Sequence, residues 1–154
     1  MNDQPQFTAG PFLWSNSLHP QTETLMPMAT KILAVDDSKT IRMVIQGAFR
    51  TYDCDLREAA NGEEGLMLAA REKPDLIILD ITMPVMDGLT MLGMLRRDPE
   101  LRATPVILLS AESSRENVNS MVRLGISDHL FKPFKEEALL NSVRKIVALR
   151  EKTT

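Results

Sequence analysis

After Lys31, five short apolar runs alternate with amphipathic stretches, and this alternation is the feature that most limits the possible folds. Ile, Leu and Val predominate in the runs, and turn residues bound them, which is typical of strands buried on both faces of a parallel sheet. The stretches between them are about three helical turns long, a usual helix length. The runs are Ile32–Val35, Cys54–Ala59, Leu76–Leu79, Val106–Leu109 and Ser127–Phe131.

This series of five βα units predicts an α/β domain with a doubly wound parallel sheet. We expect five strands in the flavodoxin-like order 2-1-3-4-5, with helices on both faces. Ser38 and Asn61 are the expected N-caps of the first two helices. Ser113 and Glu116 form a capping-box pattern for the fourth helix. The fifth helix is expected after Pro133, through Leu139, Val143 and Ile146.

Residues 1–29 differ in composition from the rest of the chain. They hold four of the nine prolines, contain no Lys or Arg, and show no sustained helix or strand period. We therefore expect a flexible N-terminal arm, or an extension from an upstream start, over 1–29 and one folded domain over 30–154. The apolar cluster Phe12-Leu13-Trp14 would suit a docking motif, but an arm without a separate function is the preferred interpretation.

The charge and the apolar content exclude several classes of function. The formal net charge is −3 with 25% charged residues, so there is no electrostatic basis for binding nucleic acid or an anionic membrane. No run of about 18 apolar residues could span a bilayer, and no signal-peptide pattern begins the chain. The single cysteine, Cys54, cannot form an internal disulfide and is expected to be a small buried side chain. We therefore expect a soluble protein of the cytoplasm.

Polar residues close four of the apolar runs. Asp36 and Asp37 follow the first, Asp80 the third, Ser110 the fourth and Lys132 the fifth. In the predicted strand order these ends are neighbours, at the edge of the sheet where α/β proteins bind ligands. Three carboxylates so close together repel one another, and a bound cation would relieve the repulsion. Oxygen ligands without Cys or His favour Mg²⁺ over Zn²⁺.

A carboxylate at a Mg²⁺ site can act as a nucleophile toward phosphorus and form an aspartyl phosphate. Such a transfer depends on positioning and on neutralisation of charge more than on acid–base chemistry. Lys132 would supply a mobile positive charge for the phosphoryl oxygens, and Ser110 would donate a hydrogen bond to one of them. The strand ends therefore predict a phosphoryl-accepting site.

Four motifs in this order resemble the receiver domains of two-component response regulators, over roughly residues 30–150. They are Val35-Asp36-Asp37-Ser38, the segment from Leu79 to Gly88, Leu109-Ser110-Ala111 and Phe131-Lys132-Pro133-Phe134. The resemblance implies that Asp80 is the phospho-acceptor and that Asp36 and Asp37 bind Mg²⁺ with Asp80 and the main-chain carbonyl of Thr82. It implies that Ser110 and Lys132 contact the phosphoryl group, that the Lys132–Pro133 bond is cis, and that Thr82 and Glu112 tune the lifetime of the phosphate.

One position departs from the family pattern. Most receivers carry Tyr or Phe three residues before the active-site lysine, and that ring swings inward on activation; here the residue is His129. A histidine is smaller, and its charge can change near neutral pH. Our hypothesis is that the usual switch is weakened or made pH-sensitive. An exposed histidine without a switching role is the alternative.

The resemblance implies a signalling switch rather than an enzyme. We expect it to lack an output domain of its own, since only four residues follow Arg150. A sensor histidine kinase or a histidine phosphotransfer protein would supply the phosphoryl group, and a downstream protein would read the result; the chain would be a monomer or a phosphorylation-linked dimer. The expected output surface, formed by the fourth helix, fifth strand and fifth helix, includes Arg115, Glu116, Arg123, His129, Glu136 and Arg144.

Three other functions compete with this one. A phosphorelay shuttle would pass the phosphoryl group on to another histidine. A phosphohydrolase of the haloacid-dehalogenase kind would need a second Asp two residues after the nucleophile, where this chain has Thr82, and a cap domain. A phosphate-independent interaction module would not need the intact set of acids, hydroxyl and lysine.

Overall fold

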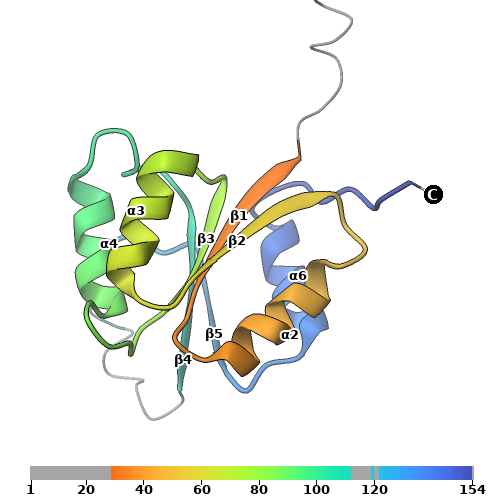
Figure 1. Ribbon diagram of the computed structural model, residues 1–154, viewed down its shortest axis with the longest axis horizontal. Coiled ribbons are helices and arrows are strands. Elements are labelled where there is room, and N and C mark those ends of the chain that lie inside the picture. The colour runs from red at the N-terminus through yellow and green to blue at the C-terminus, as the bar shows by residue number, and fades with distance from the viewer. Residues whose placement is uncertain (1–28, 112–118, 120–121, 154) are drawn as a thin grey trace, which may run out of the picture.

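The computed structural model describes residues 29–111, 119 and 122–153. These residues form a five-stranded parallel sheet in the order β2-β1-β3-β4-β5 (Figure 1), which confirms the predicted fold class and strand order. The strands are β1 (Thr30–Val35), β2 (Cys54–Ala59), β3 (Leu76–Asp80), β4 (Val106–Ala111) and β5 (Asp128–Lys132). The helices of the described part are α2 (Lys39–Phe49), α3 (Gly62–Glu72), α4 (Gly88–Arg97) and α6 (Glu136–Arg144). Our expectations for Phe12-Leu13-Trp14, Glu112, Ser113, Arg115 and Glu116 lie outside the described residues.

The helix starts follow the cap residues. The Ser38 side chain accepts a hydrogen bond from the N–H of Ile41 at the start of α2, and Asn61 does the same for Glu64 in α3, so both predicted N-caps are confirmed. The end of α6 was predicted too late, because Ile146 lies beyond the helix. There the main chain turns more tightly, and the N–H of Ile146 bonds to the carbonyl of Val143, three residues back.

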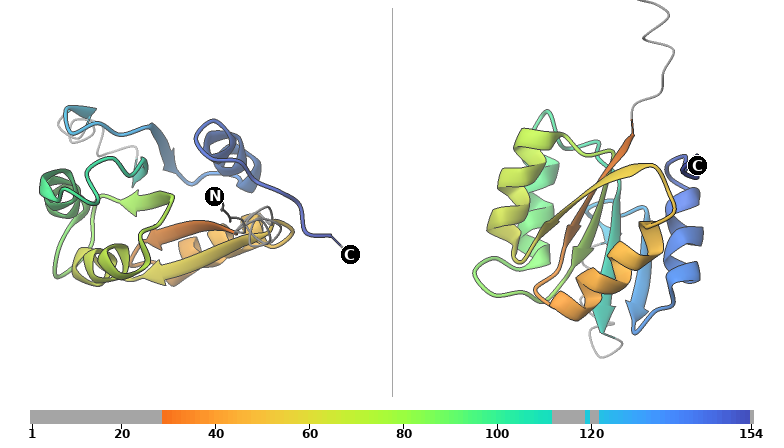
Figure 2. Two further views of the ribbon diagram at one scale, coloured as in Figure 1. Left: turned by 90° about the horizontal axis from the view of Figure 1, so that it is seen from above. Right: turned by 45° about the vertical axis from the view of Figure 1, so that its right-hand side comes forward.

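Two pairs of helices enclose the sheet. α3 and α4 cover one face, and α2 and α6 cover the other (Figures 1 and 2). Because successive side chains of a strand point to opposite faces, neighbouring residues of β1 join different cores. Leu33 and Val35 pack on the α3 and α4 side, whereas Ile32 and Ala34 pack on the α2 and α6 side.

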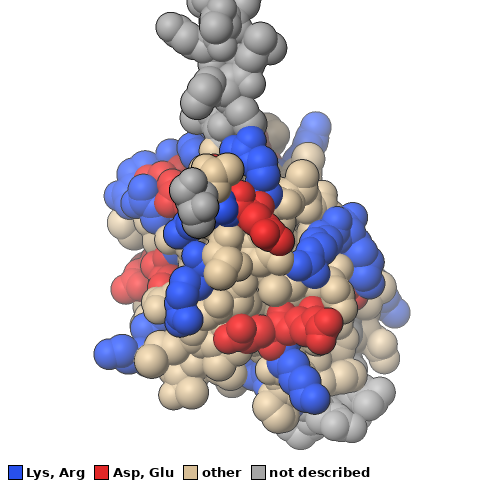
Figure 3. Space-filling view, turned by 90° about the vertical axis from the view of Figure 1, so that its right-hand side faces the viewer, with Lys and Arg blue, Asp and Glu red and all other residues tan. Residues whose placement is uncertain are grey.

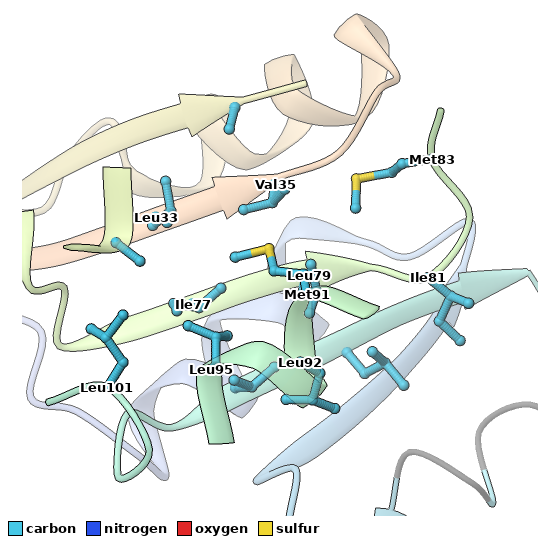
Figure 4. Packing of buried hydrophobic residues seen from close by; sticks show 14 residues of the cluster. Leu33, Val35, Ile77, Leu79, Ile81, Met83, Met91, Leu92, Leu95 and Leu101 are labelled. Carbon is cyan, nitrogen blue, oxygen red and sulfur yellow. The ribbon is translucent and has the colours of Figure 1, made fainter. Parts of the chain in front are cut away.

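The core under α4 is closely packed. Met91, Leu92 and Leu95 of this helix belong to the same buried cluster as Ile77 and Leu79 of β3 (Figure 4), and all five are fully buried. Interiors of this kind transmit strain rather than absorb it, because they contain few voids. The end of β3, where Asp80 lies, is therefore held firmly in place.

The two edge strands correct one prediction. All five runs were expected to be buried on both faces, but β5 is only half-buried along its length, and β2 is half-buried or exposed up to Ala59. Each has a neighbouring strand on one side only. β5 also lies one residue further along the chain than predicted.

Cys54 packs at the margin of the core, where burial raises the pKa of its thiol, as expected for a structural cysteine. None of the helices formed by the described residues is long and apolar enough to cross a membrane.

Candidate phosphoryl-acceptor site

The strand ends bring the predicted site residues together. Asp36 and Asp37 directly follow β1, Asp80 is the last residue of β3, Ser110 lies near the end of β4, and Lys132 is the last residue of β5. These four strands are neighbours in the sheet, so their carboxyl ends meet at one edge. The topology alone therefore accounts for the assembly of these side chains.

Three carboxylates form the centre of the site. One carboxylate oxygen each of Asp36, Asp37 and Asp80 lies within 4.8 Å of the others. Asp36 and Asp80 are 0% and 4% exposed, whereas Asp37 is exposed to solvent. Asp36 Oδ1 accepts a hydrogen bond from the N–H of Ser38 at 2.9 Å. Two of the three acids are thus buried in the protein, and the third is exposed to water.

Lys132 contacts both buried acids and partly compensates their charge. Its Nζ lies 2.8 Å from Oδ2 of Asp36 and 3.0 Å from Oδ1 of Asp80. Burial opposes the charge on this ammonium group, but hydrogen bonds and attraction from Asp36 and Asp80 outweigh it and raise the pKa of Lys132. The peptide bond between Lys132 and Pro133 is cis, the form that the family resemblance implies.

The acceptor candidate has an unusual protonation equilibrium. Burial, followed by repulsion from Asp36, raises the pKa of Asp80 to about 6, although the ammonium group of Lys132 acts in the opposite direction. The negative charge of Asp37 adds to the upward shift. One ammonium group therefore does not fully compensate this cluster of acids, which favours an additional cation there.

The donor atoms suit magnesium. All three side chains offer hard carboxylate oxygens, and the exposed side of Asp37 leaves room for the water ligands that Mg²⁺ retains. A divalent cation bound here would relieve the repulsion that, after burial, raises the pKa of Asp80. Thr82, whose carbonyl is the further predicted ligand, lies two residues after Asp80 in the loop between β3 and α4.

Ser110 and His129 form a side-chain pair beside the acids. Ser110 is 1% exposed, and its Oγ lies 2.9 Å from Nε2 of His129, within hydrogen-bond distance. The imidazole also meets the ring of Phe131 edge to face, with 4.3 Å between the ring centres. His129 is therefore half-buried in β5 rather than exposed, and it contacts a predicted site residue. Its role in switching stays a prediction.

Two neighbouring contacts support the site and were not predicted from the sequence. A Cβ atom at Gly88 would lie 2.1 Å from the carbonyl oxygen of Asp80, so α4 can begin this close to Asp80 only with glycine there. Arg42 of α2 donates from Nη1 to the carbonyl oxygen of Asp36 at 2.6 Å, and from Nε to Glu58 Oε1 at 3.0 Å. The sequence signal for this contact is Arg42 itself, a charged residue among the apolar residues of the first helix.

The expected output surface needs a correction at α6. The carboxylate of Glu136 lies next to Gly47 of α2, and the guanidinium group of Arg144 lies over the ring of Tyr52, 5.6 Å from its centre. Both side chains therefore face the α2 side and not β5, because α6 packs beside α2. Figure 3 views this side of the molecule and shows acidic and basic side chains interspersed, without a field of one sign.

The response regulator receiver domain family matches residues 32–144, and the chain belongs to this family. It is 34% identical over 118 residues to protein PilH of Pseudomonas aeruginosa, covering 77% of this chain and 98% of that protein. Chemotaxis protein CheY-3 of Vibrio cholerae is 30% identical over 125 residues, or 80% of this chain and 96% of that protein. The structure of the Vibrio cholerae chemotaxis response regulator CheY4 is similar, with a TM-score of 0.72, 34% identity and coverage of 79% and 100%. Longer relatives also match, and the chain spans 50% of the length of one such relative and 27% of the length of another.

Proposed function

We propose that this protein is a single-domain response regulator of the cytoplasm, which accepts a phosphoryl group on Asp80 in a Mg²⁺-dependent reaction. The observation that carries the proposal is the buried Asp80 carboxylate, with Lys132 Nζ 3.0 Å from its Oδ1 and two further acids beside it. Matches over nearly the full length of PilH and CheY-3 support the single-domain form. A sensor histidine kinase or a histidine phosphotransfer protein is the proposed donor.

In the proposed transfer, a carboxylate oxygen of Asp80 attacks the phosphorus atom of a phosphohistidine. The new bond joins that oxygen to phosphorus, the phosphorus–nitrogen bond breaks, and the imidazole leaves with the electron pair. Lys132, whose Nζ contacts both buried carboxylates, would turn its ammonium group toward the phosphoryl oxygens. Bound at the three acids, Mg²⁺ would neutralise charge on the transferred group. Hydrolysis of the aspartyl phosphate by water resets the switch.

Ser110 is the proposed link between the phosphoryl group and the partner surface. Its hydroxyl has a single proton to donate, and in this structure the oxygen lies against His129. Turning toward a phosphoryl oxygen would change that contact and so the position of the imidazole in β5. The surface that responds then includes β5. The downstream protein that reads this surface decides whether the chain acts as an end effector or as a shuttle.

The affinity for Mg²⁺ is expected to depend on pH. Because the pKa of Asp80 is raised to about 6, protons compete with the cation below that value. Apparent affinity in the wild type should rise about tenfold from pH 5 to pH 7 and level off above, as one unit of pH changes the ionised fraction about tenfold below the pKa. Calorimetric titration with MgCl₂ at five pH values measures this.

Two variants show whether the pH dependence of Mg²⁺ binding in that titration comes from Asp80 or from other acids. Asp80→Asn should bind Mg²⁺ weakly and with little dependence on pH. Asp75→Asn should behave like the wild type, because Asp75 accepts a hydrogen bond from Lys31 at the opposite end of the sheet. An affinity for Mg²⁺ that is equally weak at every pH in the wild type would contradict the proposed metal site.

Replacement of His129 should alter the switch. In His129→Phe the ring remains but the contact with Ser110 Oγ is lost, so Ser110 can turn without giving up a hydrogen bond of about 1 kcal/mol. We expect beryllofluoride, a stable phosphoryl analogue, to bind about five times more tightly to the variant. The affinity of the variant for beryllofluoride should also vary less between pH 6 and pH 8 than that of the wild type, because a histidine can change charge in this range and a phenylalanine cannot. NMR titration, following the Ser110 amide, measures both effects. Unchanged affinity and unchanged pH dependence would rule out a switching role for His129.

A further inference from the structure

The peptide group between Asp36 and Asp37 is held in place from outside the metal site. The carbonyl of Asp36, which belongs to this peptide group, accepts a hydrogen bond from Nη1 of Arg42 at 2.6 Å. The N–H of Asp36, in the preceding peptide group, donates to the carbonyl of Ala59 in β2 at 3.0 Å. Because a peptide group is planar, a fixed carbonyl also fixes the nitrogen and the Cα of the next residue. The contact with Arg42 therefore fixes the position of the backbone nitrogen and Cα of the exposed Asp37.

Arg42 is itself held by the neighbouring strand. Its Nε donates to Oε1 of Glu58 at 3.0 Å, and the amide of Gln46 contacts the second carboxylate oxygen of Glu58. The Arg42 side chain is only 18% exposed. A guanidinium group presents its donors in a rigid plane, so the bond to Glu58 sets the direction of the bond to Asp36.

We propose that Arg42 is a positioning residue for the metal site. Held by Glu58, it fixes the Asp36–Asp37 peptide so that both carboxylates of the acid pair can meet Asp80 around one cation. This inference rests on the proposed function, since it requires that Mg²⁺ binds there. It assigns to an arginine, which cannot itself ligate a cation, a role in binding one.

The sign of the charge effect separates positioning from simple electrostatics. Loss of a positive charge near the site would, by Coulomb's law, make Mg²⁺ bind more tightly. Loss of a positioning contact would make it bind more weakly. Arg42→Gln therefore gives opposite results under the two explanations, whereas a purely structural ion pair on the surface would leave the affinity nearly unchanged.

The test measures the dissociation constant of Mg²⁺ by calorimetry at pH 7.5 for four full-length proteins. Arg42→Gln should bind Mg²⁺ about tenfold more weakly than the wild type, the scale found for groups that orient metal ligands. Arg42→Lys keeps the charge but cannot span Asp36 and Glu58, and it should remain weaker by at least about threefold. Arg57→Gln is the matched control, because Arg57 pairs with Asp55 on the same strand as Glu58, with its side chain 49% exposed; it should match the wild type.

A second readout needs no metal. In the metal-free proteins, the backbone amide resonance of Asp37 should shift in both Arg42 variants and stay in place in Arg57→Gln. Tighter or unchanged Mg²⁺ binding by folded Arg42→Gln or Arg42→Lys would overturn the inference. If Arg42→Gln does not fold, Arg42→Lys and the Asp37 resonance decide. Failure of the wild type itself to bind Mg²⁺ would instead contradict the proposed function.

Discussion

Lys132→Met is expected to lower the free energy of unfolding of the metal-free protein by about 3 kcal/mol at pH 7.5. The substitution removes the ammonium group that contacts Asp36 Oδ2 at 2.8 Å and Asp80 Oδ1 at 3.0 Å, and leaves two buried carboxylates without it. Breaking a buried ion pair by removing one partner typically costs about 3–5 kcal/mol, because the remaining charge is not compensated. Urea denaturation with and without Mg²⁺ measures the effect.

Mg²⁺ should restore most of this loss, since the cation replaces the missing positive charge, and the variant should bind Mg²⁺ more tightly than the wild type. Lys145→Met is the matched control. Lys145 pairs with Asp128 at 3.4 Å with its side chain 70% exposed, and an exposed pair contributes about 0–1 kcal/mol. A loss within 1 kcal/mol for Lys132→Met, equal to that control, would mean that the acids do not depend on this ammonium group.

The sequence predicted the parts of the site that depend on topology. Alternating apolar runs imply parallel strands, parallel strands bring their carboxyl ends to one edge, and the residues at those ends are then neighbours. The topology alone therefore predicts that Asp36, Asp80 and Lys132 lie together. Their functional roles are a separate matter, which the family resemblance implies and which the experiments above address.

Contacts that depend on register were not predictable in the same way. His129 pairs with Leu108, and Ser110 lies two residues further along β4 on the same face, which brings it to the imidazole. A shift of one residue in the pairing register moves all side chains of a strand to the other face, and the apolar pattern does not specify which residues of two strands pair. The bond from Arg42 to the Asp36 carbonyl depends on the side-chain rotamers of Arg42 and Glu58, which the apolar pattern does not specify.

Asp80→Asn is expected to abolish phosphorylation altogether, because the amide that replaces the carboxylate is not a nucleophile toward phosphorus. The buried carboxylate is the only group of the proposed chemistry that forms a covalent bond. The substitution keeps the size of the side chain, so folding should be preserved.

The same substitution removes a buried carboxyl group whose pKa is raised to about 6. It should therefore stabilise the metal-free protein at neutral pH, with an effect that shrinks as the pH falls below 6.

The most direct test of the central claim is intact mass spectrometry after incubation with acetyl phosphate, for the wild type and Asp80→Asn, each with and without Mg²⁺. We expect a labile gain of one phosphoryl group, about 80 Da, in the wild type with Mg²⁺ only. Phosphorylation of Asp80→Asn, or a gain that does not require Mg²⁺, would contradict the account. So would the absence of any gain in a folded wild type that also fails to accept a phosphoryl group from phosphohistidine donors.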